Sequence, residues 1–242
     1  MSSTIDLQEV EKFSKIADEW WSQTGKFKPL HKFNPIRISF IRRKIIQHFS
    51  LDEKSTKPFA NLKIIDIGCG GGLVAEPFSR MGADVTGVDA SEKNISVAKI
   101  HAEKSGLKIN YFVDSIETFA EKEEKYDVVF ALEIIEHVAD VENFIKGCSK
   151  VLKPNGLLFI ATMNRTLKSL ALAKIAVEYV LRWLPQGTHD WKKFLKPSEV
   201  NFYTSQNGLN LLELKGFSYN IIKDEWKEVD NLDVNYAAVF TN

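Results

Sequence analysis

Three side chains that could do chemistry follow an apolar run near the middle of the sequence. The run at 126–132, YDVVFAL, predicts a buried strand, and Glu133, Glu136 and His137 come directly after it. Residues at i, i+3 and i+4 share one face of a helical turn, so we expect the three side chains to point the same way. Such a group could bind a divalent cation, supply a histidine as general base, or place acidic charge at the positive end of a helix dipole. These alternatives stay open from the residues alone.

Alternating strands and helices must position these side chains. Short apolar runs rich in β-branched residues predict strands at 62–68, 84–91, 109–115, 126–132 and 157–163, with helices at 73–83, 92–106 and 141–156. Two further strands, at 210–223 and 235–242, have no clear helix between them, so we expect that pair to be antiparallel. The pattern predicts an α/β fold with a mostly parallel seven-stranded sheet, helices on both faces and an antiparallel last strand.

The first 55 residues differ in character from the rest. Apolar residues recur at three- and four-residue steps from Leu7 to Trp20, which predicts an amphipathic helix, and a second such helix is predicted at 36–49. The polar segment at 50–61 is the expected boundary. We therefore expect a helical cap at 1–55 and a main domain at 56–242.

Charge and cysteine content exclude several classes of protein. Lys plus Arg equals Asp plus Glu, 32 against 32, so no net field would draw the chain to nucleic acid. Cys69 and Cys148 offer neither a disulfide framework nor a metal knuckle, which indicates a reducing compartment. Charges lie where a signal peptide would need an apolar core, so we read no secretion signal.

The carboxyl ends of the first three predicted strands carry glycines and carboxylates. The loop DIGCGGG contains Gly68 and Gly70, and glycines there would let the backbone approach a ligand closely. Asp89 follows about 20 residues later, where a carboxylate can accept hydrogen bonds from both ribose hydroxyls of an adenosine. At the third strand end, Asp114 could reach the adenine amino group.

Two adenosine cofactors compete for this loop. Gly70, Gly72 and Ala75 satisfy the dinucleotide pattern GxGxxG/A, which keeps a nicotinamide enzyme in view. However, Asp66 lies in the same loop, where it would repel a pyrophosphate but is compatible with a sulfonium. The glycines also run together instead of being spaced. We therefore favour S-adenosylmethionine over NAD.

In combination, the motifs resemble a known family. The runs IIDIGCGGG, VTGVDAS, VVFALEIIEHV and LKPNGLLFIATMNRT are similar to class I S-adenosylmethionine-dependent methyltransferases. More narrowly, EIIEHV with MNRTLKS, LPQGTHDWKKFLKPSE and NPIR is similar to the ubiquinone biosynthesis O-methyltransferases, over about residues 8–240. The resemblance implies a Rossmann-like class I methyltransferase fold, with Gly68, Asp89, Leu132 and Arg37 contacting the cofactor. Arg37 would place its guanidinium fork on the methionine carboxylate.

The resemblance also implies the reaction, which is O-methylation of a catechol-type hydroxyl on polyprenylated ubiquinone precursors, including demethylubiquinol, in both O-methylation steps. A phenol titrates at about pH 10, so at neutral pH it needs a base or a metal. His137 is the candidate base. The family implies Mg²⁺ held by Glu133, Glu136 and His137, although magnesium prefers oxygen ligands and could leave the imidazole catalytic. His189, in GTHDW, is a second catalytic candidate because a carboxylate follows it directly.

The stretch at 167–185 is the most hydrophobic in the chain. Lys174, Glu178 and Arg182 form one polar stripe along it, so we do not expect it to cross a bilayer. A core helix, a lid over an apolar substrate and a helix lying in the membrane interface remain as alternatives. Because the family's substrates carry polyprenyl tails, we favour the lid or the interface.

The expected location is cytoplasmic, with peripheral association at the inner face of the membrane. The expected partners are the polyprenyl substrate and other ubiquinone-synthesis enzymes, with no nucleic acid. Two functions from other classes compete with this interpretation: a nicotinamide-dependent oxidoreductase, and a non-catalytic membrane-associated adaptor on the same fold.

Overall fold

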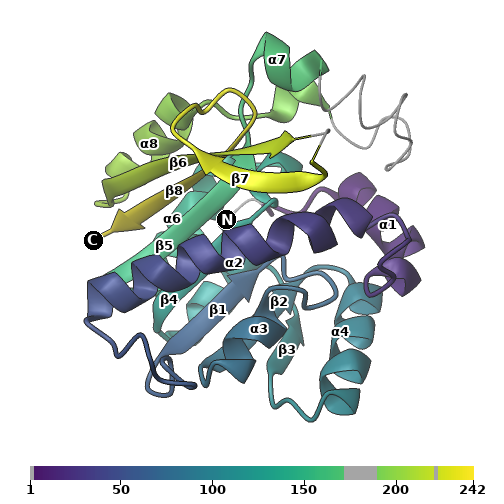
Figure 1. Ribbon diagram of the computed structural model, residues 1–242, viewed down its shortest axis with the longest axis vertical. Helices are drawn as coiled ribbons and strands as arrows, with labels where there is room; N and C mark the ends of the chain where they lie inside the picture. The colour runs from purple at the N-terminus through teal and green to yellow at the C-terminus, as the bar shows by residue number, and fades with distance from the viewer. Residues whose placement is uncertain (1–2, 172–189, 221–222) are drawn as a thin grey trace.

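Among the residues that the structure describes, an eight-stranded sheet organises the fold (Figure 1). The computed structural model describes residues 3–171, 190–220 and 223–242. The strands are β1 (Lys63–Ile67), β2 (Asp84–Asp89), β3 (Asn110–Val113), β4 (Tyr126–Leu132), β5 (Leu152–Met163), β6 (Asn210–Asn220), β7 (Glu225–Val229) and β8 (Asn235–Thr241). Their order is β3-β2-β1-β4-β5-β8-β6-β7. The pairs among β1 to β5 are parallel, and β8, β6 and β7 join as antiparallel strands.

The predicted α/β fold is confirmed, but the sheet has one strand more than the seven expected. The additional strand is β7, with the sequence EWKEV, which pairs with β6 at the edge of the sheet. None of its five residues is fully buried. A short, mostly polar edge strand gives no apolar signal in the sequence, which explains why it was not predicted.

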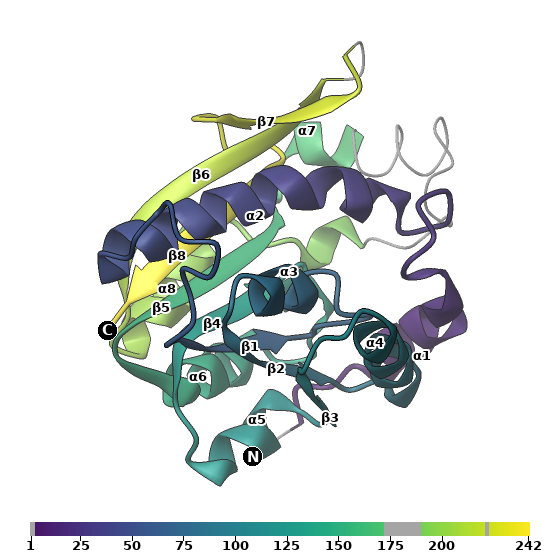
Figure 2. The ribbon, with the colours of Figure 1, turned by 60° about the horizontal axis from the view of Figure 1, so that its bottom comes forward.

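Helices cover both faces of the sheet (Figures 1 and 2). The α-helices are α1 (Leu7–Lys15), α2 (Lys28–Phe49), α3 (Ala75–Arg80), α4 (Glu92–Lys104), α5 (Ile116–Phe119), α6 (Val141–Val151), α7 (Leu167–Ser169) and α8 (Pro197–Gln206). Short 3₁₀ turns are η1 (Ala17–Glu19), η2 (Ala120–Lys122), η3 (Ile135–His137) and η5 (Trp191–Lys193). Helices α2, α3 and α4 share one buried cluster with the sheet, and α5, α6 and α8 share the other.

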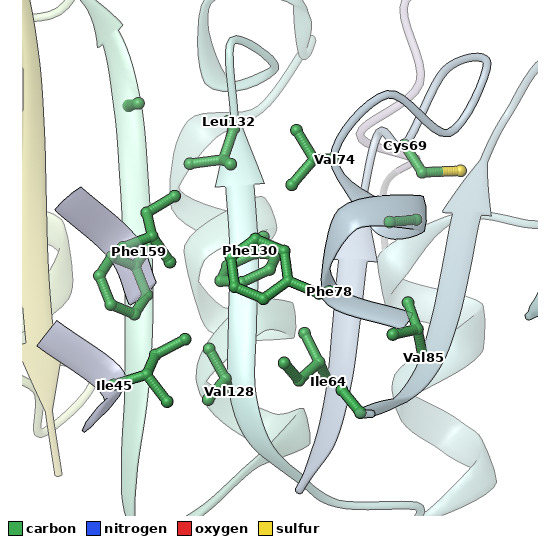
Figure 3. Close-up of a cluster of buried hydrophobic side chains, with 14 of the residues drawn as sticks. Ile45, Ile64, Cys69, Val74, Phe78, Val85, Val128, Phe130, Leu132 and Phe159 are labelled. Atoms are coloured by element: carbon green, nitrogen blue, oxygen red, sulfur yellow. The ribbon is translucent and has the colours of Figure 1, made fainter. Parts of the chain in front are cut away.

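Helix α2 is part of the core on the first face. Phe40, Ile41 and Ile45 are buried in the same cluster as residues of β4 and β5. In Figure 3, Ile45 lies beside the strand that carries Phe159. Each such side chain removed from water contributes about 1.5–3 kcal/mol, so α2 is held firmly on the sheet. Helix α2 and the strands therefore share one core across the expected boundary at 50–61, and the division at residue 55 stays a prediction about chain organisation.

The segment before α2, residues 4–27, lies against α4 near the carboxyl ends of the strands (Figure 2). Asp6 caps α1, because its side chain accepts two backbone N–H groups of the first turn. Beyond α1, Trp20 stacks on Phe27 with 3.7 Å between ring centroids. Ala17 and Leu73 are buried with this pair. We call residues 4–27 the N-terminal segment.

The apolar stretch expected at 167–185 is described only at its start. Helix α7 follows Thr166, whose side-chain oxygen accepts the N–H of Ser169. Residues 172–189 lie outside the described residues. Within the described ranges, no helix is both long and apolar enough to span a membrane. The core, lid and interface alternatives for this stretch remain predictions.

Candidate active site

A pocket opens at the carboxyl ends of β1, β2 and β4, and its volume is ≈ 780 Å³ counted with its open mouth. Strand β1 lies between β2 and β4, so the strand order reverses here, which is where open α/β sheets bind ligands. The N-terminal segment forms the wall that faces the strand ends, through residues that include Thr4, Asp6, Glu9, Phe13 and Trp20. The pocket is therefore closed by parts of the chain that are far apart in sequence.

The glycine loop forms the floor of this pocket beneath Trp20. Gly68 and Gly70 both line the pocket and have left-handed backbones, with φ of +71° and +53°. A Cβ on Gly70 would lie 2.4 Å from the Trp20 ring, and one on Gly68 would lie 2.6 Å from Ile134. Both positions therefore need glycine for conformation and for space.

Asp89, at the end of β2, lines the pocket with its carboxylate held by the backbone. Its Oδ2 accepts the N–H of Gly70 at 2.9 Å, and its Oδ1 accepts the N–H of Ser91 at 2.8 Å. The Asn94 side chain donates to the same Oδ1 at 3.1 Å. Burial raises the pKa of Asp89, while the N–H groups of Ser91 and Gly70 oppose that rise. A carboxylate oxygen can accept more than one donor, so Asp89 retains capacity for a ligand hydroxyl.

Asp114 lies on the same wall at the end of β3. It lines the pocket, and its Oδ1 accepts the N–H of Ser115 at 2.9 Å. Its Oδ2 accepts from Lys122 Nζ at 2.8 Å. Gly68, Gly70, Asp89 and Asp114 therefore line one pocket, as their places at the carboxyl ends of parallel strands predicted.

Arg37 lies behind the pocket among acidic residues and is not one of the pocket-lining residues. It is 3% exposed, and its Nη1 lies 3.7 Å from Glu133 Oε1. Burial lowers the pKa of Arg37, whereas Glu133, Asp66 and Glu136 raise it. Among the described residues, its Nε and Nη1 have no hydrogen-bond partner. Its Nη2 donates to Asn34 Oδ1, one turn back on α2, which holds the guanidinium beside the strand-end carboxylates. The contact of Arg37 with the cofactor stays a prediction.

Leu132 also points away from the pocket. It is 7% exposed and belongs to the core cluster, where Figure 3 shows it near Val74 above Phe130 on the same strand. Strand β4 ends at Leu132, and the left-handed backbone of Glu133 then redirects the chain, so that Glu133 and Ile134 line the pocket. The contact of Leu132 with the cofactor stays a prediction.

Glu133, Glu136 and His137 do not share a helical face, so that expectation was wrong. Glu133 has a left-handed backbone with φ of +55°, and its N–H donates to the carbonyl oxygen of Ala161 at 2.8 Å. This bond continues the ladder between β4 and β5, and only a single 3₁₀ turn, Ile135–His137, follows. Glu133 and His137 line the pocket, while Glu136 is 3% exposed.

The two glutamates carry buried oxygens that lack partners. Among the described residues, Glu133 Oε1 and both Glu136 side-chain oxygens have no hydrogen-bond partner. Burial raises the pKa of Glu133 to about 7; Glu136 adds to the rise and Arg37 opposes it. Unpartnered carboxylate oxygens suit a hard cation such as Mg²⁺. However, within the described part of the chain, no three His, Cys, Asp or Glu side chains are close enough to hold a metal ion, so the predicted triad is not assembled.

His137 is instead joined to Glu9 of α1, a residue that the sequence did not single out. His137 Nδ1 lies 3.0 Å from Glu9 Oε2, and Phe13 packs edge-on against the imidazole at 5.1 Å between ring centroids. Burial alone would lower the pKa of His137, but the hydrogen bond to Glu9 and the nearby charge of Glu136 raise it. A glutamate on an amphipathic helix normally faces solvent, so only the tertiary contact reveals this pair.

Trp20, Ser91 and Asn94 also line the pocket and were not predicted as site residues. For Trp20, the sequence signal was its place at the end of the apolar periodicity that begins at Leu7, which indicated a helix face and not a ligand site. His189, the second catalytic candidate, lies outside the described residues and stays a prediction.

Known proteins share this fold and this sequence. A methyltransferase-domain family model matches residues 65–160. A solved S-adenosylmethionine-dependent methyltransferase from Clostridium acetobutylicum is similar with a TM-score of 0.61 at 16% identity, over 96% of this chain and 98% of that one. The ubiquinone biosynthesis O-methyltransferases of Pelagibacter ubique and Bartonella bacilliformis are each 53% identical over 98% of this chain, and over 98% and 96% of their own lengths.

The fold and the strand-end pocket with its glycine loop define a class I S-adenosylmethionine-dependent methyltransferase. At 53% identity over nearly the whole length, the chain belongs to the ubiquinone biosynthesis O-methyltransferase family. This membership confirms the predicted fold and family. The alternatives of a nicotinamide-dependent oxidoreductase and a non-catalytic adaptor find no support among these relatives.

Proposed function

We propose that this enzyme transfers the methyl group of S-adenosylmethionine to a catechol-type hydroxyl of polyprenylated ubiquinone precursors, in both O-methylation steps. The demethylubiquinol hydroxyl is one of the acceptors in this proposal. One observation carries it: a single pocket joins Asp89 and the glycine loop to Glu133 and His137. The residues proposed to bind the adenosyl cofactor and those proposed to bind the phenolic hydroxyl of the acceptor therefore line the same cavity.

On the cofactor side, the proposal assigns the ribose hydroxyls to Asp89 and the adenine amino group to Asp114. Gly68 and Gly70 line this side of the pocket, and the absence of a Cβ lets the loop pack directly against Ile134 and Trp20. The sulfonium carries positive charge, and the side chain of Glu133, which lines the pocket, favours a cation there when it is ionised. Arg37 is proposed to meet the methionine carboxylate only after its side chain turns from Glu133.

On the acceptor side, the proposal assigns the general base to His137. The hydroxyl proton passes to the imidazole, the oxygen attacks the methyl carbon, and the carbon–sulfur bond breaks to leave a neutral thioether. Glu9 holds His137 through Nδ1, which fixes the ring orientation and stabilises the imidazolium that forms. General-base catalysis of this kind contributes about 10²–10⁴-fold to the rate.

Glu133 and Glu136 are proposed as the residues that would hold Mg²⁺, with waters completing its coordination. Their unpartnered oxygens fit a hard cation, and two carboxylates plus waters suit magnesium better than imidazole does. A bound Mg²⁺ would lower the pKa of a hydroxyl that it coordinates. In this assignment His137 remains the base rather than a ligand.

The polyprenyl tail of the proposed substrate is apolar, so its binding needs an apolar surface. We propose that the stretch at 167–185 supplies it, as a lid or as a helix in the membrane interface, which would place the enzyme in the cytoplasm at the inner face of the membrane. His189 would then lie beside the acceptor as a second catalytic residue, and other ubiquinone-synthesis enzymes would be neighbours. The family relationship supports this part of the proposal.

The direct experiment is turnover of a short-tailed catechol with S-adenosylmethionine, followed by mass spectrometry. We expect a product heavier by one methyl group on oxygen, together with S-adenosylhomocysteine. His137→Gln should lower kcat, measured at saturating S-adenosylmethionine, by about 10²–10⁴-fold. If the wild-type enzyme binds the cofactor but methylates neither the catechol nor a demethylubiquinol analogue, the proposed substrate class is wrong.

A further inference from the structure

Asp89 is tied to the N-terminal segment through a chain of three side chains. Trp20 Nε1 donates to Asn94 Oδ1 at 2.9 Å, and Asn94 Nδ2 donates to Asp89 Oδ1 at 3.1 Å. Both Trp20 and Asn94 are buried, at 8% and 3% exposure. The chain links the N-terminal segment, helix α4 and the end of β2.

The chemistry of the indole fixes the direction of this chain. An indole N–H can only donate, so the carbonyl oxygen of Asn94 must face Trp20. The amide NH₂ of Asn94 must then face the carboxylate of Asp89. The backbone N–H of Asn94 also donates to Ser91 Oγ at 3.2 Å, which holds the residue at the start of α4. A single orientation of the Asn94 side chain therefore satisfies both neighbours.

The Trp20 ring is itself held in place from several sides. It stacks on Phe27, and it covers Gly70 and Gly71, where an added Cβ would lie 2.4 Å from ring atoms. The same Gly70 donates its N–H to Asp89 Oδ2 at 2.9 Å. Trp20 therefore covers Gly70, which donates to Asp89 Oδ2, and it orients Asn94, which donates to Asp89 Oδ1.

We propose that Trp20 and Asn94 are positioning residues for the cofactor ribose, and that docking of the N-terminal segment sets the orientation of Asp89. Oδ1 accepts from Asn94 and Ser91, whereas among the described residues Oδ2 accepts only the N–H of Gly70, so Oδ2 keeps capacity for a ligand hydroxyl. When the indole N–H is removed, the Asn94 amide loses its fixed orientation and so does the carboxylate. This inference rests on the proposed binding of S-adenosylmethionine.

The test compares S-adenosylhomocysteine with its 2′,3′-dideoxy analogue by titration calorimetry. The ratio of the two dissociation constants reports how well Asp89 meets the hydroxyls. For wild type we expect a ratio of about 10 or more, because hydrogen bonds to a charged group contribute about 1.5–3 kcal/mol. In Trp20→Phe, which keeps the ring packing, we expect the ratio to fall several-fold because only the hydroxyl-bearing ligand loses affinity.

Trp21→Phe is the matched control. Trp21 also donates through its indole N–H, but to the carbonyl oxygen of Gly71 at 2.9 Å and not to Asn94. Its removal should shift both affinities together and leave the ratio unchanged. Asn94→Leu tests the same chain without altering the tryptophan, and the double variant with Trp20→Phe should lower the ratio no further, since both act through one path.

The outcomes separate this inference from the proposed function. If wild type binds neither ligand, the cofactor assignment fails. If wild type discriminates between the ligands and both Trp20→Phe and Asn94→Leu keep the same ratio, the cofactor assignment stands and Trp20 only packs. A ratio that falls in both variants, but not in Trp21→Phe, supports the positioning role.

Discussion

Glu9 and His137 are 128 positions apart in the sequence, and their side chains meet at 3.0 Å between Glu9 Oε2 and His137 Nδ1. The contact joins helix α1 to the turn after β4 across the mouth of the pocket. The hydrogen bond from His137 lowers the pKa of Glu9 to about 2, against the opposing effect of burial. The N-terminal segment is therefore held to the strand ends by a charge-assisted pair as well as by its aromatic packing.

Glu9→Gln should destabilise the protein by about 1.5–3 kcal/mol, the usual contribution of a hydrogen bond to a charged group. Urea denaturation at pH 7 measures the loss. Glu11→Gln is the control, because Glu11 pairs with Lys15 at 2.7 Å on an exposed face, where such pairs contribute little to stability. Equal costs for the two variants would mean that the Glu9–His137 pair does not hold the N-terminal segment.

Gly70→Ala should cost more than Gly106→Ala, although both glycines have left-handed backbones, with φ of +53° and +66°. Each variant pays about 1 kcal/mol for the backbone conformation. An added Cβ at Gly70 also meets Trp20 at 2.4 Å, whereas the one at Gly106 has nothing within 4 Å. We expect only Gly70→Ala to weaken S-adenosylhomocysteine binding in calorimetry. Equal binding by the two variants would argue against the close approach of Trp20 to the loop.

Asp66→Asn should stabilise the protein at alkaline pH. Burial raises the pKa of Asp66 from 3.8 to about 7, and the charge of Arg37 only partly offsets this. Between those pH values the unfolded chain releases a proton that the folded protein keeps, so wild-type stability falls as pH rises and levels off above about 7. The full effect reaches up to about 4 kcal/mol.

Denaturation of Asp66→Asn and wild type from pH 5 to pH 8 tests this expectation. The advantage of the variant should grow with pH over that range. Asp18→Asn, at an exposed position, serves as control and should track wild type at every pH. A constant difference between Asp66→Asn and wild type across the range would contradict the raised pKa.

Chelation separates the metal role from cofactor binding. If Glu133 and Glu136 hold Mg²⁺, EDTA should abolish turnover, and added Mg²⁺ should restore it, while S-adenosylhomocysteine binding stays unchanged. Glu133→Gln combined with Glu136→Gln should remove the heat of Mg²⁺ binding in calorimetry. Full activity in EDTA would exclude the metal and leave His137 as the only activating group in the proposal.

The strand-end part of the site could be predicted because it follows from local rules. Parallel strands bring their carboxyl ends to one edge, so Gly68, Asp89 and Asp114 had to meet once the strands were assigned. The run of glycines predicted that another group lies very close to the loop backbone. The sequence could not show that this group is the Trp20 ring. The positions of these residues are set by the direction and order of the strands more than by side-chain packing.

The rest of the site depends on contacts between distant segments. Glu133 was expected on a helix, but its N–H continues the β-ladder by bonding to Ala161, and no local pattern encodes that choice. Arg37 and Leu132 carry the family's motifs, yet α2 and β4 turn them toward buried carboxylates and toward the core. For Glu9, the sequence showed only the periodicity of an amphipathic helix. That pattern predicts that a glutamate faces solvent, not the pocket.

Calorimetric titration of the purified enzyme with S-adenosylhomocysteine tests the central claim, which is that the glycine loop and Asp89 bind an adenosyl cofactor. We expect wild type and Asp84→Ala, an exposed aspartate at the other end of β2, to bind alike. Asp89→Ala should bind at least about 10-fold more weakly, because it loses charged acceptors for the ribose hydroxyls. Absence of binding to wild type, or binding to Asp89→Ala as tight as to wild type, would contradict the account.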